Sequence, residues 1–177
     1  MAVRAVFLDR DGVVNEVVRR NGVPVSPVDF RELRIRPGIR ECIRELKNNG
    51  WMVLIVTNQP DIARGGLDPD ELEKMHGYIR ASLEVDDIIV CPHDTADGCR
   101  CRKPRPGMLE DGAARYGIDL SGSFMAGDQQ KDMAAGRAAG CRTILVDAPY
   151  NRGVQSDFTV ADPGNISRVV LGKDRRA

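Results

Sequence analysis

One stretch near the start of the chain decides the fold, Val3-Arg4-Ala5-Val6-Phe7-Leu8-Asp9-Arg10-Asp11-Gly12-Val13-Val14-Asn15. Its apolar run stops at Asp9 and Asp11, which predicts a buried parallel strand that delivers two carboxylates into a loop. Ligands of open α/β sheets bind at this end of the strands. Extended backbone places Asp9 and Asp11 on one side and Arg10 on the other. Because such carboxylates repel each other without a cation or a shared proton, the stretch indicates a ligand site, with a plain Asp-Gly turn as the alternative.

Composition limits the classes of protein to consider. The chain has 177 residues, which predicts a single domain over 1–177. It has 26 basic and 26 acidic residues, and its basic segment 100–105 lacks interleaved aromatics, so we expect no nucleic-acid partner. No apolar run approaches the ~20 residues of a membrane span, and no signal sequence is evident. We therefore expect a cytoplasmic monomer without a membrane partner.

Apolar segments alternate with helical patterns along the rest of the chain. Further buried strands are predicted at 51–56, 87–90, 124–126 and 141–146, and helices at 39–49, 68–83, 109–116 and 134–139. This order predicts an α/β fold, a Rossmann-like parallel sheet with helices on both faces. Residues 16–35 are expected to form an irregular loop, the chain after 147 is rich in loop signals, and 173–176 form a charged tail.

The spacing of the polar residues leaves no room for a separate cap domain. Asp11 and Thr57 are 46 positions apart, as are Thr57 and Lys103, and a strand, a helix and a loop use each span. We expect only the 16–35 loop and the loop after the third strand to cover the site. Arg19 and Arg20 are candidates to reach a distal anionic group of a substrate; the alternative is two solvated arginines.

Polar residues also follow the other predicted strands. Thr57-Asn58-Gln59 offers neutral donors for phosphoryl oxygens, prolines hold Lys103 in a fixed loop, and Gly127-Asp128 and Asp132 supply carboxylates. The carboxyl ends of parallel strands meet at one edge, so these groups are expected to form one site. Mg²⁺ held by carboxylate and phosphate oxygens would suit phosphoryl transfer there. His76 is expected to be a packed or surface helix residue rather than a ligand.

Three of the five cysteines lie in the loop after the third strand. The pattern Cys91-x-His93 followed by Cys99-x-Cys101 brings four ligand-type side chains into eleven residues. Zinc closes structural sites with four such ligands. An odd number of cysteines, clustered in this way, argues for a metal site in a reducing compartment rather than a disulfide framework. We therefore expect Zn²⁺ to staple this loop without acting in catalysis.

Together these elements resemble the haloacid dehalogenase superfamily of phosphatases over nearly the whole chain. Asp9-Arg10-Asp11-Gly12 looks like its first motif, Thr57-Asn58 its second, Lys103 its third, and Gly127-Asp128 with Asp132 its fourth. The Cys-Pro-His…Cys-x-Cys-Arg-Lys-Pro loop resembles the D-glycero-D-manno-heptose-1,7-bisphosphate 7-phosphatase family, a close relative of the phosphatase part of histidinol-phosphatase. The resemblance implies a Mg²⁺-dependent phosphatase that acts on the C7 phosphate of this small phosphorylated sugar.

The resemblance also implies a role for each matching residue. Asp9 is expected to be the nucleophile that forms an aspartyl phosphate, and Asp11 the general acid and base, with its backbone carbonyl on Mg²⁺. Asp9 and Asp128 are expected to supply carboxylate ligands to the same ion. The residues expected to hold the phosphoryl group or the rest of the substrate, or to support the site, are Thr57, Asn58, Gln59, Arg102, Lys103 and Asp132. Gln129 stands where this family often carries lysine, and Lys131 is nearby.

Two other functions are open at this stage. A histidinol-phosphate phosphatase would transfer the same group from a cationic substrate. The arginines available to line a distal pocket favour a second anion instead; they are Arg19, Arg20, Arg102 and Arg105. A non-enzymatic, zinc-stabilised interaction module would give Asp9, Lys103 and Asp128 no reason to converge.

Overall fold

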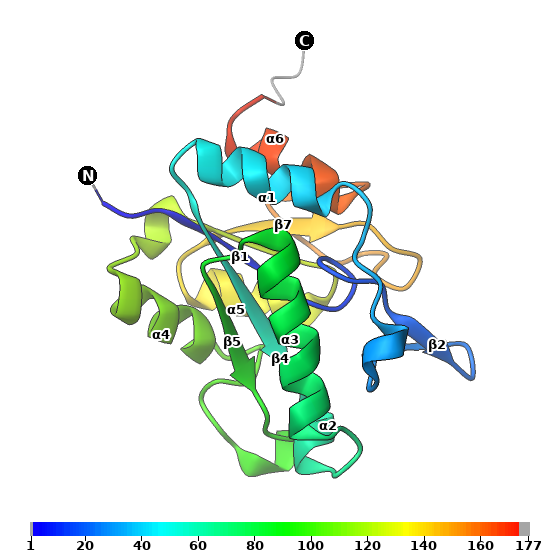
Figure 1. Cartoon of the computed structure of the whole chain (residues 1–177). Coiled ribbons are helices and arrows are strands. Elements are labelled where there is room, and N and C mark those ends of the chain that lie inside the picture. The colour runs from blue at the N-terminus through cyan, green and yellow to red at the C-terminus, as the bar shows by residue number, and fades with distance from the viewer. Residues whose placement is uncertain (1, 174–177) are drawn as a thin grey trace.

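A six-stranded parallel sheet forms the centre of the molecule (Figure 1). The computed structural model describes residues 2–173. The strands lie in the order β5 (Asp87–Cys91), β4 (Met52–Asn58), β1 (Ala5–Leu8), β6 (Phe124–Gly127), β7 (Arg142–Val146) and β8 (Phe158–Val160). Each neighbouring pair is parallel. The predicted α/β fold with a Rossmann-like sheet is confirmed.

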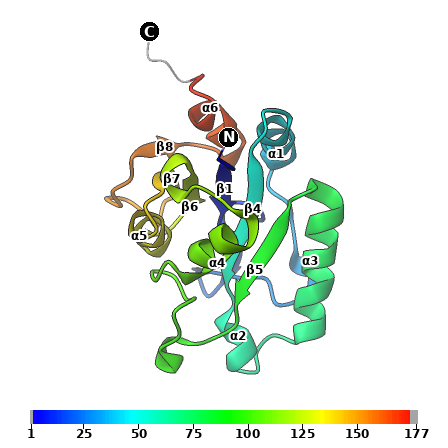
Figure 2. The same ribbon diagram turned by 90° about the vertical axis from the view of Figure 1, so that its left-hand side faces the viewer.

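Helices cover both faces of the sheet, and Figure 2 shows α1 and α3 on one side and α4 and α5 on the other. The α-helices are α1 (Ile39–Asn48), α2 (Pro60–Ala63), α3 (Pro69–Leu83), α4 (Gly107–Tyr116), α5 (Gln130–Ala138) and α6 (Ile166–Val170). Short 3₁₀ turns are η1 (Phe30–Glu32), η2 (Thr95–Asp97), η3 (Leu120–Gly122) and η4 (Pro163–Asn165). The predicted start of α3 is present: the Asp68 side chain accepts from the Asp70 N–H, with Pro69 at the first helical position.

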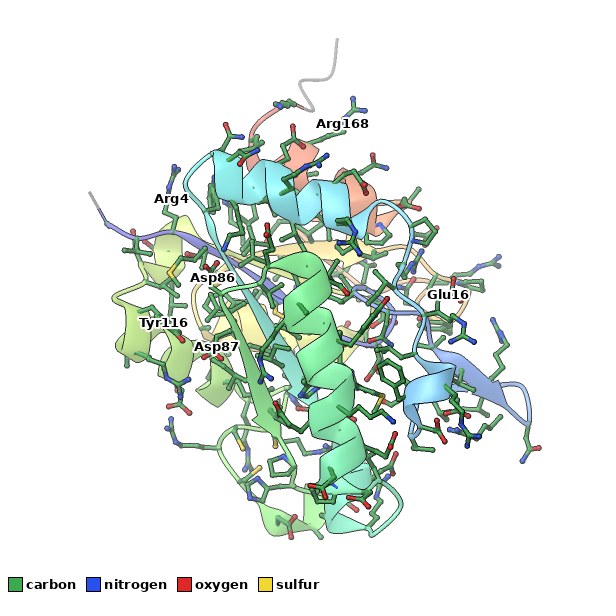
Figure 3. All side chains as sticks on the ribbon, in the orientation of Figure 1. Arg4, Glu16, Asp86, Asp87, Tyr116 and Arg168 are labelled. Carbon is green, nitrogen blue, oxygen red and sulfur yellow. The ribbon has the colours of Figure 1, made fainter. Side chains whose placement is uncertain are left out.

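The alternation of side chains along β1 divides the core into two layers. Val6 and Leu8 pack with the buried residues of α1, α3 and α6, whereas Ala5 and Phe7 pack with those of α4 and α5. A strand that is buried on both faces is apolar at every position, which is why the run Ala5–Leu8 has no polar interruption. On the outside, the Tyr116 hydroxyl of α4 donates to Asp87 of β5 at 2.9 Å (Figure 3).

The segment 16–35 is more regular than predicted. It forms an antiparallel hairpin of β2 (Val18–Arg20) and β3 (Val23–Val25), followed by η1. Asn21 and Gly22, which separate the strands, have φ values of 52° and 79°. Two residues with positive φ match the twist of paired strands, and Asn-Gly is the dipeptide that adopts this turn most readily. The expectation of an irregular loop was therefore wrong.

The predicted strands differ from the observed ones at two further places. β1 ends at Leu8, so the backbone turns at Asp9 and Arg10, and the expected alternation does not continue to Asp11. The three-residue strand β8 lies in the segment predicted as loop, where exposed Phe158 and Thr159 hide its pattern.

No cap domain is inserted between the elements of residues 2–173, because their strands form only the central sheet and the β2–β3 pair. None of the helices within this range has both the length and the apolar character needed to cross a membrane. Residues 174–176 of the predicted charged tail lie outside the described residues.

Candidate active site

Three carboxylates converge at the carboxyl edge of the sheet. Asp9 follows β1, Asp128 follows β6, and Asp132 lies in the first turn of α5. One oxygen of each lies within 4.8 Å of one oxygen of the others, and all three residues are buried. They meet because β1 and β6 are neighbours, and the Asp9 N–H donates to the Ala126 carbonyl at 2.9 Å. The sequence predicted this convergence from acids at the ends of two separate strands.

Lys103 provides the cation of this cluster. Its Nζ lies 2.8 Å from Asp9 Oδ1 and 2.7 Å from Asp132 Oδ1, and it donates to the Val56 carbonyl at 2.9 Å. Burial alone would lower the pKa of Lys103, but Asp132 and Asp9 outweigh burial and raise it above the ordinary value. Lys103 is therefore a permanent positive charge in the site.

The carboxylates outnumber the ammonium, which makes the cluster suitable for a divalent cation. Burial and the nearby Asp132 raise the pKa of Asp9 to about 6, and burial and Asp9 raise that of Asp128 to about 7. Asp128 Oδ1 is buried without a hydrogen-bond partner among residues 2–173. Carboxylate oxygens that repel one another in this way suit Mg²⁺. Asp9 and Asp128 are the residues that would hold the ion.

A glycine permits the close approach that this cluster requires. Gly12 has φ +91°, and a Cβ at this position would lie 2.1 Å from Asp128 Oδ2. Any side chain at position 12 would therefore displace the Asp128 carboxylate and also strain the backbone.

Asp11 lies outside the three-carboxylate cluster and is held by several donors. Arg10 Nε donates to Oδ1 at 3.0 Å and Arg10 Nη2 to Oδ2 at 3.1 Å. The side chains of Asn15, Ser26 and Gln59 donate to it at 2.9, 2.8 and 3.0 Å. Burial alone would raise the pKa of Asp11, but the Arg10 charge and these hydrogen bonds outweigh burial and lower it. The expectation that Arg10 points away from Asp11 was wrong, because the chain turns at Arg10.

The polar residues at the end of β4 are divided between two tasks. Asn58 makes a pair of hydrogen bonds with the Lys103 backbone, donating to its carbonyl at 3.0 Å and accepting from its N–H at 3.1 Å. Gln59 Nε2 donates to both Asp11 Oδ2 and Thr57 Oγ1. Both amide side chains therefore help to position Lys103 and Asp11. Contact of Asn58 and Gln59 with a phosphoryl group stays a prediction. The buried Thr57 hydroxyl still has its hydrogen to donate.

The four predicted zinc ligands lie together. Cys101 Sγ is 3.2 Å from Cys91 Sγ, 3.5 Å from Cys99 Sγ and 3.4 Å from His93 Nδ1. Ligands around tetrahedral zinc are separated by about 3.8 Å for two sulfurs, given a Zn–S bond of ~2.3 Å. Burial raises the pKa of Cys91 to about 12, so a thiolate here needs a cation beside it. The donor set and its spacing therefore fit zinc.

Comparison with known proteins identifies the family. A family model described as HAD-hydrolase-like matches residues 100–158. The chain is 41% identical over 151 residues to the D-glycero-β-D-manno-heptose-1,7-bisphosphate 7-phosphatase of Pseudomonas aeruginosa, with 82% of each chain covered. It is 39% identical over 155 residues to the protein of the same name from Bordetella bronchiseptica, with 85% of this chain and 84% of the relative covered. The chain belongs to the heptose-1,7-bisphosphate 7-phosphatase family.

Members of this family are phosphoric monoester hydrolases of the HAD type, and so is this protein. A crystal structure of D,D-heptose 1,7-bisphosphate phosphatase from B. bronchiseptica, complexed with magnesium and phosphate, is 33% identical to it. The two structures match with a TM-score of 0.85 over 97% of this chain and 99% of the other. The predicted family is confirmed.

In this member of the heptose bisphosphate phosphatase family, Lys103 is one of the residues that line a cavity of about 340 Å³. Arg102, Arg105 and Lys131 also line it, with Asp94 as the acidic residue of the lining. Arg102 Nη1 donates to the His93 carbonyl at 3.1 Å, and Arg105 donates to the Cys99 carbonyl. The cavity is therefore cationic, and Lys103 is the residue of its lining that also contacts the carboxylate cluster.

Arg19 and Arg20 lie on the hairpin and are not among the residues that line this cavity. Arg20 forms an ion pair with Glu32 at 2.7 Å, and Arg19 Nη1 donates to the Gly22 carbonyl at 3.3 Å. Their contact with a substrate stays a prediction.

Among the contacts that sequence reasoning missed are those of Tyr150 and Ser26. The Tyr150 hydroxyl donates to Asp128 Oδ2, and Ser26 contacts Asp11. Both residues lie in predicted loops with no motif around them, so the sequence held no pattern that could assign them. Asp132, by contrast, was predicted as support: its Oδ2 accepts from the Gln129 N–H at 3.0 Å at the start of α5, where Gln129 is the N-cap.

Proposed function

We propose that this protein is a Mg²⁺-dependent phosphatase that removes the C7 phosphate of D-glycero-D-manno-heptose 1,7-bisphosphate through an aspartyl-phosphate intermediate. One observation carries the mechanism: Asp9 and Asp128 lie beside Lys103 in a buried cluster with more carboxylates than cations. The names of the relatives from P. aeruginosa and B. bronchiseptica support the substrate. The magnesium and phosphate in the B. bronchiseptica phosphatase support the cofactor.

Asp9 acts as the nucleophile. One of its oxygens attacks phosphorus, the bond from phosphorus to the sugar oxygen breaks, and Asp11 gives a proton to that oxygen. Water then attacks the aspartyl phosphate and gives a proton to Asp11, and Asp9 is released. The hydrogen bonds of Asp11 to Arg10, Asn15 and Ser26 favour its ionised form, which is the form that this second step requires.

Lys103 and Thr57 bind the transferring group. Lys103 Nζ donates to the carbonyl of Val56, the residue before Thr57 on β4. From there the ammonium would neutralise, and the Thr57 hydroxyl would donate to, the equatorial oxygens of phosphorus. Mg²⁺, held by Asp9, Asp128 and the Asp11 carbonyl, would supply further positive charge to the same oxygens. Asn58, Gln59 and Asp132 keep the catalytic groups in position.

The cationic cavity supports a substrate with a second anionic group. Arg102 and Lys131 border the space beyond Lys103, where a C1 phosphate would be attracted and the ammonium of histidinol phosphate repelled. Arg102 is the proposed clamp for this distal group. Zn²⁺ bound by Cys91, His93, Cys99 and Cys101 stabilises the loop that carries Arg102 and takes no part in phosphoryl transfer.

Phosphate release measures this proposal directly. We expect release from the heptose bisphosphate to need Mg²⁺, to stop on chelation, and to exceed release from histidinol phosphate by at least about 100-fold in kcat/KM. Arg102→Ala should raise KM for the bisphosphate and leave the kcat for p-nitrophenyl phosphate within about twofold. Equal kcat/KM values for the two natural phosphates would reject the proposed substrate, and unchanged selectivity in Arg102→Ala would reject the clamp.

A further inference from the structure

A charged side chain is enclosed in the interior behind the acid/base residue. Arg10 is 0% exposed, although its guanidinium carries a full positive charge. Two of its nitrogens face the two oxygens of Asp11 in a forked arrangement, at 3.0 and 3.1 Å. Such forked pairs fix the orientation of the carboxylate as well as its charge. The direction in which Asp11 points therefore depends on what holds Arg10.

The third nitrogen of the fork contacts a buried histidine of α3. Arg10 Nη1 lies 3.1 Å from His76 Nε2, and His76 is 1% exposed. Guanidinium nitrogens donate and cannot accept, so Nε2 accepts and the ring proton is on Nδ1. Burial and the charges of Arg10 and Arg80 lower the pKa of His76 to about 3, against an opposing effect of Asp11. His76 is accordingly a neutral imidazole that accepts a hydrogen bond from the Arg10 guanidinium.

We infer that His76 is a positioning residue for catalysis, which fixes the Arg10 fork and through it the orientation of the Asp11 carboxylate. The inference rests on the proposed role of Asp11 in proton transfer. Asn15, Ser26 and Gln59 also bond Asp11, but each makes one hydrogen bond to it, whereas Arg10 contacts both oxygens. Without an acceptor at position 76, Nη1 would be buried and unpaired, and the guanidinium would turn toward another acceptor.

The experiment compares two substrates that differ in their need for an acid. An alkyl phosphate such as the heptose bisphosphate needs a proton on its leaving oxygen, whereas p-nitrophenolate leaves without one. The ratio of the two kcat/KM values does not depend on the fraction of enzyme that is folded, so it separates positioning from stability. It also reports the step in which the leaving group departs, and not the later hydrolysis of the aspartyl phosphate, in which Asp11 is the proposed base for both substrates. His76→Phe removes the acceptor at similar size, and His76→Gln restores an acceptor close to the position of Nε2. Ile79→Ala, one turn further along α3 and buried, is the control for loss of packing alone.

We expect His76→Phe to lower the kcat/KM ratio of alkyl to p-nitrophenyl phosphate by about tenfold, a fraction of the full effect of general acid catalysis. KM should change by less than about twofold, because the ring does not touch the substrate. His76→Gln should recover most of the ratio, and Ile79→Ala should leave it unchanged. Asp11→Asn should lower the same ratio further.

The outcomes separate this inference from the proposed function. If Asp11→Asn lowers the ratio and His76→Phe does not, the role of His76 is wrong and the proposed mechanism stands. An equal fall in Ile79→Ala would also overturn the inference, because loss of packing would then explain it. If Asp11→Asn leaves the ratio unchanged, the acid role of Asp11 is wrong, and the positioning role of His76 falls with it.

Discussion

Asp9 and Lys103 are opposite charges that the fold removes almost entirely from water. Their side chains are 6% and 0% exposed, and Lys103 is shared with Asp132. The single positive charge of Lys103 is therefore divided between two carboxylates, and each is neutralised less than it would be in a pair of its own. The result is a local excess of negative charge that a divalent cation would relieve, around the carboxylate proposed as the nucleophile.

Asp9→Asn should abolish phosphate release while the protein stays folded. Loss of a nucleophile lowers kcat by about 10³-fold or more. Because burial and Asp132 disfavour the charged form of Asp9, the neutral amide should not lower the melting temperature of the Mg²⁺-free protein. Phosphate release and thermal unfolding measure the two effects, and full Mg²⁺-dependent turnover in the variant would contradict the nucleophile assignment.

His76 should make the free energy of unfolding decrease as the pH falls. Folding lowers the pKa of His76 from 6.5 to about 3, so as the pH falls the imidazole takes up a proton in the unfolded chain before it does so in the folded protein. The contribution of neutral His76 to the free energy of unfolding is complete above about pH 6.5 and is lost as the pH falls toward 3. Between pH 6.5 and 5 the loss should be about 2 kcal/mol. Denaturant titrations at these two pH values should show a smaller loss in His76→Phe than in the native protein. An identical loss in both proteins would mean that His76 is not the titrating group.

At the scale of elements, the loop between β5 and α4 has little regular secondary structure, so its four predicted zinc ligands would contribute to its shape. η2 within it is only three residues long, and Cys91 is the one ligand that belongs to a strand. The same loop carries Arg102 and leads directly to Lys103.

Removal of zinc should loosen this loop. Chelation should lower the free energy of unfolding by about 3 kcal/mol if zinc is present at ~100 times its dissociation constant. It should also raise KM for the bisphosphate, since the Arg102 guanidinium bonds the His93 carbonyl inside the loop. Metal analysis should give one zinc per chain, and none in Cys99→Ser. Full stability and activity in a zinc-free protein with saturating Mg²⁺ would contradict the staple.

The elements that could be predicted from sequence are those whose pattern is local. The apolar run before Asp9 predicts β1, and the Cys/His spacing predicts the ligand cluster. Contacts between distant residues could not be predicted: Asn58 and Lys103 are 45 positions apart, and Arg10 and His76 are 66 apart. In such pairs neither residue has a neighbour in sequence that reveals its partner. The polar motifs therefore predict the location of the site, and only the structure shows which side chains the amides of Asn58 and Gln59 contact.

At the scale of the whole molecule, one sheet joins two apolar layers. Strands β1, β4 and β6 contribute alternate residues to both, so neither layer can be lost without the other.

Unfolding should therefore be a single transition of one domain over residues 1–177. The fluorescence of Trp51, buried in the layer of α1 and α3, and the far-UV circular dichroism should change at the same urea concentration. Sedimentation is expected to give the mass of a monomer. Two separated transitions would contradict the single-domain assignment, and a dimer mass would contradict the monomer.

The contacts of Lys103 have one more consequence. An ammonium has three N–H bonds, and Lys103 already has three neighbours, the Val56 carbonyl and one oxygen each of Asp9 and Asp132. A phosphate that accepts a hydrogen bond from Lys103 should therefore displace one of these three partners. If the displaced partner is Asp9, binding of the substrate would itself free the carboxylate oxygen that we propose as the nucleophile. Before the substrate binds, the ion pair with Lys103 would make that oxygen less reactive toward other electrophiles.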